Sequence, residues 1–420
     1  MKKYTKFGLL AAAFLVSLSG FSQNRQLDNF RNPDKTGINV FEAPKDSVST
    51  FDGIKVRVGG SSTLQFQAIN HENSGAVELI EIGDNFNLAT ANLDLDVALA
   101  KGVRMHLRTY LSSRHHPEPY VKGGYLQVDN LDFISPGFLE NTMKYVTVKV
   151  GHMENNYGDA HFRRTDNAQA MHNPFVGNLI MDAFTTEVGG EVYFRKNGFI
   201  GMFGLSNGKL NQAVTNPDAT GASILAKLGY DGQINEDLRL RLTGSMYSTN
   251  KSGRVYLYSA DRAGSRYYLV MEDTEASATS NFRSGRYNPG FNNEITAFMI
   301  NPFVKYKGLE FFGTIETASG KTNAETEDRK ATQLAGELIY RFGNNENFYL
   351  ATRYNTVTSD DPSGSEVTID RFQLGGGAFL TKNILMKVEY VNQQYDGFDT
   401  TSIFNEGQFK GLLLEAVISF

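Results

Sequence analysis

The chain has 420 residues, a formal net charge of −5 and a mean hydropathy of −0.34. The acidic balance argues against nucleic acid as a partner, and the lack of cysteine excludes disulfides and a lipid-attachment cysteine. A composition of 41 Gly, 20 Tyr and 30 Phe against 10 Pro indicates an all-β fold. The low mean hydropathy does not exclude a membrane barrel, whose apolar residues occupy alternate positions.

The first residues predict export. Three lysines precede an apolar run over Phe7–Leu18, and Gly20-Phe21-Ser22 follows as a small-x-small cleavage site. The apolar run is shorter than a membrane-spanning helix requires, so residues 1–22 are interpreted as a signal peptide. Residues 23–53 are polar and irregular, and we expect a periplasmic segment there. The alternative is a plug that enters a barrel formed by residues 54–420.

The stretch Ala91–Leu111 is the clearest hairpin. Aliphatic residues alternate with polar ones on both arms, so each arm has one apolar and one charged face. Opposed residues must share a face, which excludes simple pairing around a two-residue loop and favours a three-residue loop at Ala100–Gly102. The expected pairs are Leu99–Val103, Leu95–Leu107, Asp96–His106 and Asp94–Arg108.

The same alternation recurs along the chain, which predicts about sixteen strands. They lie near residues 56–70, 91–99, 103–111, 120–129, 143–153, 184–195, 199–206, 224–230, 238–247, 295–306, 309–317, 334–342, 348–356, 369–380, 384–395 and 408–420. A further hairpin from 254–259 and 266–271 would raise the number to about eighteen.

The connections between the predicted strands alternate between short turns and longer polar loops. This asymmetry is typical of a transmembrane antiparallel barrel in the outer membrane of a Gram-negative bacterium, where lipid surrounds the wall. The connection over 130–142 does not fit, because it should be short. A soluble β-sandwich or solenoid is the alternative.

The last strand supports the barrel. Its alternate residues Leu412, Leu414, Ala416, Ile418 and Phe420 form one apolar face that ends in an aromatic residue. A terminal Phe on an amphipathic strand resembles the signal that the barrel-assembly machinery reads, so that machinery is an expected partner.

With the aliphatic face toward lipid, the charged face lines the lumen. Opposed signs are often adjacent, so the wall is either a set of structural cross-strand pairs or an ion path, and the two readings are compatible. Candidate pore residues on the wall are Arg104, Arg108, Asp94, Asp96, Arg239 and Arg241.

The segment 155–182 departs most from the strand pattern. A loop of this length stands in solvent or folds into the pore, where its charges would form a constriction that senses anions or hydrogen-bonding solutes. The alternative is a lid that these charges pin to the wall. The candidate residues are Asp159, His161, Arg163, Arg164 and Asp166.

Several segments together resemble a known family. Val-Gly-Gly before the first strand, Lys-Val-Gly-His-Met before the 155–182 loop, and the terminal strand look like phosphate-selective porins. The segments around residues 157–167 and 387–393 are similar to porin-like barrels of the Bacteroidetes. The resemblance implies passive diffusion of small hydrophilic solutes, with anion preference, and by analogy a homotrimer. The acids that alternate with the basic residues depart from the arginine ladder of phosphate-selective members.

The alternative function is a non-conducting structural or partner-binding barrel. Asp96 opposite His106 looks like a catalytic pair, but a structural hydrogen bond is the simpler reading, and we expect no enzyme. His115-His116 could bind a metal, although adjacent side chains in a strand point apart. We expect no metal and no cofactor.

Overall fold

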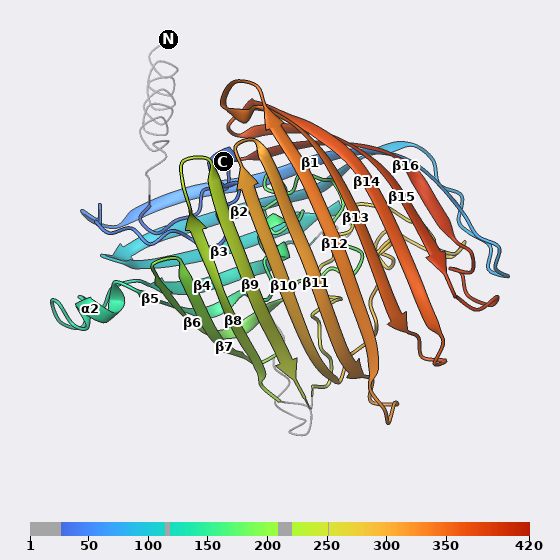
Figure 1. Ribbon diagram of the computed structural model, residues 1–420, viewed down its shortest axis with the longest axis horizontal. Coiled ribbons are helices and arrows are strands. Elements are labelled where there is room, and N and C mark those ends of the chain that lie inside the picture. Colours follow the sequence, from blue (N-terminus) through green and yellow to red (C-terminus); the bar gives the residue numbers. More distant parts are fainter. Residues whose placement is uncertain (1–26, 114–117, 209–220, 251) are drawn as a thin grey trace, which may run out of the picture.

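The computed structural model describes residues 27–113, 118–208, 221–250 and 252–420 (Figure 1). The predicted signal peptide (1–22) and the His115-His116 pair lie outside these ranges. Among the described residues, no helix is long and apolar enough to cross a membrane.

The described chain forms sixteen strands. They are β1 (Lys55–Glu72), β2 (Asn85–Ala100), β3 (Val103–Ser112), β4 (Tyr120–Val128), β5 (Val146–Glu154), β6 (Thr186–Lys196), β7 (Phe199–Ser206), β8 (Ser223–Gln233), β9 (Leu238–Thr249), β10 (Glu294–Tyr306), β11 (Leu309–Lys321), β12 (Arg329–Phe342), β13 (Phe348–Asp360), β14 (Glu366–Thr381), β15 (Ile384–Asp396) and β16 (Gln408–Ser419). The short helices are η1 (Lys35–Gly37), α2 (Glu140–Met143), η3 (Ala160–Arg163) and η5 (Asn344–Glu346).

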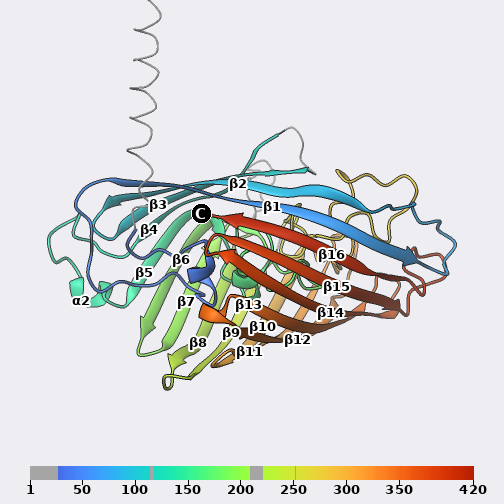
Figure 2. The same ribbon diagram turned by 90° about the horizontal axis from the view of Figure 1, so that it is seen from above.

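The strands form one closed antiparallel barrel in which each strand pairs with its neighbours in sequence (Figures 1 and 2). β1 and β16 close the ring: Gly60 and Phe420 exchange two backbone hydrogen bonds of 3.0 Å. A closed ring leaves no unpaired edge, which a hydrocarbon environment requires. The predicted barrel of sixteen strands is confirmed. The eighteen-strand alternative is wrong, because residues 254–259 and 266–271 are not strands.

The hairpin of β2 and β3 has the predicted pairs Leu95–Leu107, Asp96–His106 and Asp94–Arg108. The predicted three-residue loop is wrong. Ala100 pairs with Val103 around a two-residue turn at Lys101-Gly102, where Gly102 has a φ of 67°, and an irregularity between Ala98 and Ala100 restores the register. A bulge of this kind inserts one extra residue in one strand and lets both faces stay in phase.

The apolar face of each strand points outward. Leu93 is 54% exposed, whereas Asp94 and Asp96 are 3% and 1% exposed. The last strand shows the same contrast, since Leu414 is 46% exposed and Glu415 is buried. The charges therefore lie inside the barrel and the aliphatic side chains outside, as expected for a wall in lipid.

The connections define two ends. We call the end with the β2–β3, β6–β7, β8–β9, β10–β11, β12–β13 and β14–β15 turns the turn end, and the other the loop end. The long connection between β4 and β5 lies at the turn end and carries α2, which projects clear of the wall at the left of Figure 1.

Candidate functional site

Three segments occupy the lumen. We call residues 27–46 the N-terminal insert, residues 155–185 the first inner loop, and residues 252–293 the second inner loop. Most side chains of the first inner loop are buried, as are many of the second. Apolar residues of both loops share one cluster with inward residues of the wall, and Ala170, Met171 and Phe175 of the first loop belong to another. The second inner loop, coloured yellow, runs behind β10–β12 in Figure 1.

The first inner loop crosses the barrel. It leaves β5, returns to β6, and between them contacts strands on the opposite side of the ring. The backbone amides of Val176 and Gly177 donate to Glu389 on β15 at 2.7 and 3.1 Å. A buried loop must satisfy its backbone groups, and here side chains of the wall replace the partners that a sheet or water would supply.

Cations of the wall bind the carbonyl groups of this loop. Arg353 donates to Gly177 at 3.0 Å, Arg371 to Asn178 at 2.7 Å, and Lys387 to Ala170 at 2.7 Å. These residues lie on the charged face, which was expected to line the lumen, and they do face it. Besides the loop, Arg353 binds Glu337 at 2.7 Å and Lys387 binds Glu415 at 2.8 Å.

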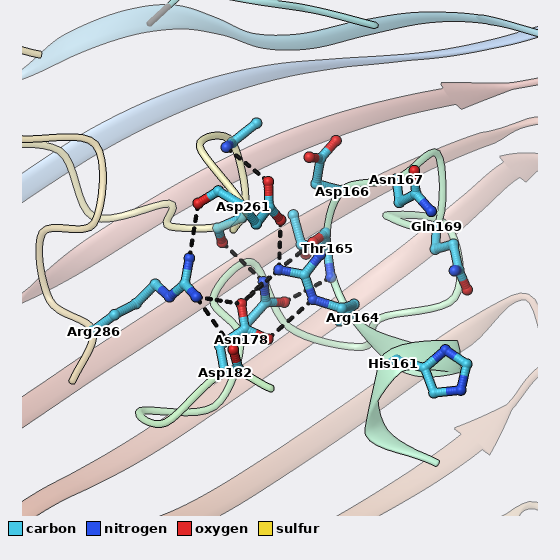
Figure 3. A network of polar contacts seen from close by, with 12 residues as sticks. His161, Arg164, Thr165, Asp166, Asn167, Gln169, Asn178, Asp182, Asp261 and Arg286 are labelled. Atoms are coloured by element: carbon cyan, nitrogen blue, oxygen red, sulfur yellow. Dashed lines mark hydrogen bonds and ion pairs between the residues drawn. The ribbon is translucent and has the colours of Figure 1, made fainter. Parts of the chain in front are cut away.

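A charged network joins the two inner loops (Figure 3). Arg164 lies between Asp182, at 2.5 Å, and Asp261 of the second inner loop, at 2.6 Å. Arg286 approaches Asp182 at 3.4 Å, and Lys122 of β4 binds Asp261 at 2.9 Å and also Asp166. Removing one member of such a buried network leaves an uncompensated charge, which is costly.

The network shifts the pKa of its loop residues. Burial alone would lower the pKa of Arg164, but Asp182 and Asp261 hold it above its ordinary value. Burial would raise the pKa of Asp261, but Lys122 and Arg164 hold it well below. Burial raises the pKa of Asp166 even though Lys122 opposes it, so Asp166 is protonated more easily than Asp261.

Asp159 lies in a second ionic group at the turn-end side of the first inner loop. It accepts from Arg241 at 2.8 Å, from Thr243 at 2.8 Å and from Lys227 at 3.0 Å. Burial would raise the pKa of Asp159, but Lys227 and Arg241 hold it below its ordinary value. Arg241 also binds Glu42 of the N-terminal insert at 2.8 and 3.0 Å.

The other candidate residues of the loop are anchors as well. Arg163 donates to Asn39 of the N-terminal insert at 2.5 Å and lies 3.4 Å from Glu337 of β12. His161 bonds Glu154 at 2.6 Å and Asn156 at 3.0 Å, and burial lowers its pKa. Both side chains are buried.

The wall candidates divide into two places. Arg108 binds Asp94 through two hydrogen bonds of 2.7 Å, and Asp96 is shared by His106 at 2.8 Å, Arg57 at 3.0 Å and Arg104 at 3.4 Å. Because two arginines share Asp96 with the histidine, it is a structural ion cluster and not an isolated acid–base pair. Arg239, on the other side of the ring, binds Asp231 at 2.7 Å.

The structure thus brings three groups of the candidate residues together. Asp159 binds Arg241, and Asp94 binds Arg108. Arg164 and Asp166 belong to one network, in which Asp261 and Lys122 connect them. Sequence reasoning missed Glu42, Lys122, Asp182 and Asp261, because their partners lie far away along the chain. Apolar residues such as Val255 and Leu257, inside a stretch read as an outer loop, were the available signal for the second inner loop.

One cavity of about 160 Å³ remains between the β1–β6 wall, the N-terminal insert and the first inner loop. Six arginines and lysines and four carboxylates line it. The basic residues are Arg31, Arg57, Arg104, Arg108, Lys122 and Lys149, and the acids are Glu42, Asp94, Asp96 and Glu154. Within the described ranges, no group of three or more His, Asp or Glu residues is placed to hold a metal ion.

No protein-family model and no curated protein sequence matches the chain. Solved structures do. The anion-selective porin from Comamonas acidovorans has a TM-score of 0.53 at 13% identity, over 87% of this chain and 100% of that one. The outer membrane channel DcaP of Acinetobacter baumannii has a TM-score of 0.53 at 12% identity, over 89% of this chain and 99% of that one. OmpT of Vibrio cholerae, in a trimer form, has a TM-score of 0.53 at 10% identity, over 88% of this chain and 100% of that one.

The chain has the fold of an outer-membrane porin. At identities of 10 to 13%, this similarity describes the architecture, and the solutes, partners and assembly of those proteins remain theirs.

Proposed function

We propose that the protein is a passive outer-membrane channel for small hydrophilic solutes. The observation that carries this proposal is a closed barrel with an apolar outer face and a charged inner face that still encloses a polar cavity. The inner loops then narrow the path and select for small solutes.

The proposal includes the export of the protein, its location in the cell and its assembly. Residues 1–22 serve as the signal peptide, residues 23–53 as an N-terminal segment whose residues 27–46 enter the lumen from the periplasmic side, and residues 54–420 as the barrel in the outer membrane of a Gram-negative bacterium. Phe420 ends the strand that the barrel-assembly machinery binds. The channel assembles as a homotrimer, in line with the trimer form among the similar structures.

We further propose a preference for anions. The cavity lining holds more arginines and lysines than carboxylates, and a positive lining raises the local concentration of anions. The resemblance to phosphate-selective porins and to Bacteroidetes barrels agrees with this preference. Phosphate itself is the weaker candidate, because most cations here are already paired with acids.

Planar-bilayer recording of the purified mature protein tests both parts. Stepwise current is expected, and under a salt gradient the sign of the reversal potential should show that anions permeate more readily than cations. Replacing both Arg163 and Arg164 by Ala should raise the conductance, because both anchor the first inner loop. An equal conductance would remove this loop from the constriction.

A second candidate is a non-conducting barrel with a structural or partner-binding role. The observation that favours it is the filling of the lumen by three segments, two of which, the inner loops, share an apolar cluster. Absence of stepwise current from correctly folded protein would favour this candidate and overturn the channel. Neither candidate requires catalysis, and we propose no enzymatic activity.

A further inference from the structure

Lys149 is one of two cations of the cavity, among the described residues, that have no carboxylate partner. It lies on β5, faces the cavity and is only partly buried. Across the described part of the chain, no carboxylate lies within 4.0 Å of its ammonium group, and its side chain donates no hydrogen bond to any described residue. Arg57, Arg104, Arg108 and Lys122 all have carboxylate partners.

The expected partner of Lys149 is engaged elsewhere. Glu191 of β6 lies directly opposite Lys149 in the sheet. Its carboxylate instead accepts the backbone amide of Asn156 at 3.0 Å and the hydroxyl of Tyr193. The first inner loop thus takes the acid that would neutralise Lys149, and the ammonium group faces the cavity unpaired.

The surroundings of Lys149 are aromatic and apolar. Its ammonium lies 5.4 Å from the ring centre of Tyr125 and 5.1 Å from that of Tyr193. Met153, Phe41 and Phe162 also line the cavity. Aromatic faces stabilise a cation without neutralising it, so the charge remains available to a ligand.

A second cation of the cavity also lacks an acid. Arg31 of the N-terminal insert donates to the carbonyls of Gly37, at 3.2 Å, and Phe162, at 2.9 Å, and to the amide oxygen of Gln169, at 2.9 Å. All three acceptors are neutral. Burial without a carboxylate partner lowers the pKa of Arg31 to about 9, which leaves it protonated at neutral pH.

We infer that this cavity binds a small organic monocarboxylate, with its carboxylate on Lys149 and its apolar body against Tyr125, Tyr193 and Met153. The inference deepens the proposed function, on which it rests for the solute's route, by naming the solute class. Pockets for small ligands combine apolar walls with a few polar groups that orient the ligand, as here. Entry of one negative charge reduces the positive excess of the lining.

Inorganic phosphate fits the cavity less well. Phosphate recognition uses several donors at once, often the fork of an arginine. The guanidinium fork of Arg108 is occupied by Asp94, and Arg57 and Arg104 each donate to Asp96. The apolar side chains offer phosphate nothing, whereas they bury the body of an aromatic or aliphatic carboxylate.

Calorimetric titration of the folded mature barrel in detergent tests the inference without requiring conduction. Benzoate and butyrate are titrated against inorganic phosphate, into wild type, Lys149→Gln, Lys149→Arg and Lys305→Gln. Lys305 is the matched control, because it is a lumenal lysine outside this cavity with acids of its own at 3.3 and 2.9 Å. Retained heat-modifiable migration on gels checks that each variant is folded.

The expected result is binding of benzoate that weakens at least tenfold in Lys149→Gln, with near-normal binding in Lys149→Arg and Lys305→Gln. Phosphate that binds as tightly as benzoate would overturn the solute class. No benzoate binding to wild type, or equal loss in Lys305→Gln, would overturn the site. Binding without current supports the site and rejects the channel, whereas current without binding does the reverse.

Discussion

The N-terminal insert is held in the lumen by an ion pair that can be removed with one substitution. Glu42 binds Arg241 at 2.8 and 3.0 Å and lies 3.8 Å from Lys227, in a place where all three side chains are buried. Glu42→Gln keeps the size of the side chain and removes its charge. We expect the insert to leave its site more often as a result.

The magnitude follows from the partners that remain. Breaking a buried ion pair by removing one member costs about 3–5 kcal/mol. Arg241 keeps Asp159 at 2.8 Å, so the low end, about 3 kcal/mol, applies. This corresponds to roughly a hundredfold rise in the undocked fraction of the insert. The ring of Phe41, whose centre lies 5.4 Å from the ring centre of Phe303, still contributes to docking in the variant.

The chain has no cysteine, so one engineered thiol can report on this equilibrium. A cysteine placed at Ala43, beside Glu42, should react with a maleimide roughly a hundredfold faster in the Glu42→Gln background. Glu236→Gln is the control, because Glu236 is an exposed acid at the same end. Equal labelling rates in the two backgrounds, or an equal rise in the control, would refute the reasoning.

Three further predictions concern pH, the loop network and the wall. The pKa of Glu42 is about 2 instead of 4.5, because Arg241 and Lys227 outweigh the effect of burial. The contribution of Glu42 to docking is therefore full above pH 4.5 and is lost as the pH falls toward 2, which the labelling rate, divided by that of an exposed cysteine at the same pH, should show. Arg164→Ala should destabilise the barrel by about 3–5 kcal/mol in thermal unfolding, whereas loss of the exposed Lys144 should cost less than about 1 kcal/mol. Leu414→Arg should cost about 2–4 kcal/mol in denaturant titration of vesicle-folded barrel, and Ser363→Arg in an exposed turn should be neutral.

Each of these results could contradict the structure. A labelling rate, corrected in this way, that does not change between pH 5 and pH 3 would mean that docking does not lower the pKa of Glu42. Equal melting temperatures for Arg164→Ala and wild type would mean that the network between the inner loops contributes nothing. An Arg tolerated at Leu414 would place that residue away from lipid.

The strands of the barrel wall could be predicted, because the alternation of apolar and polar residues that marks them is a local pattern in the sequence. Period-two alternation assigns Leu95 and Asp96 to opposite faces, and facing residues must match, so the register of β2 and β3 follows from the sequence. The bulge beside Ala100 could not be predicted, because both loop lengths satisfy the matching of faces once a residue is allowed to bulge.

The sequence left open whether the N-terminal segment and the 155–182 loop enter the lumen, because the contacts that decide this join residues far apart in the chain. Lys122 and Asp261 are 139 positions apart, and no pattern near either residue points to the other. A polar loop that packs into a charged lumen has the composition of one that stands in water. The candidate residues Arg163 and Arg164 were thus identified as part of an unusual loop, while their buried partners were not.

The order of synthesis opposes the order in which the N-terminal insert can be placed. Lys45 binds Asp129 after β4, Glu42 binds Arg241 of β9, and Lys35 bonds the backbone of Lys382 after β14. Its docking site therefore does not exist until almost every strand has joined the ring, and contacts so distant in sequence form late. The first segment of the described chain therefore docks last, and its docking requires a barrel that is almost complete.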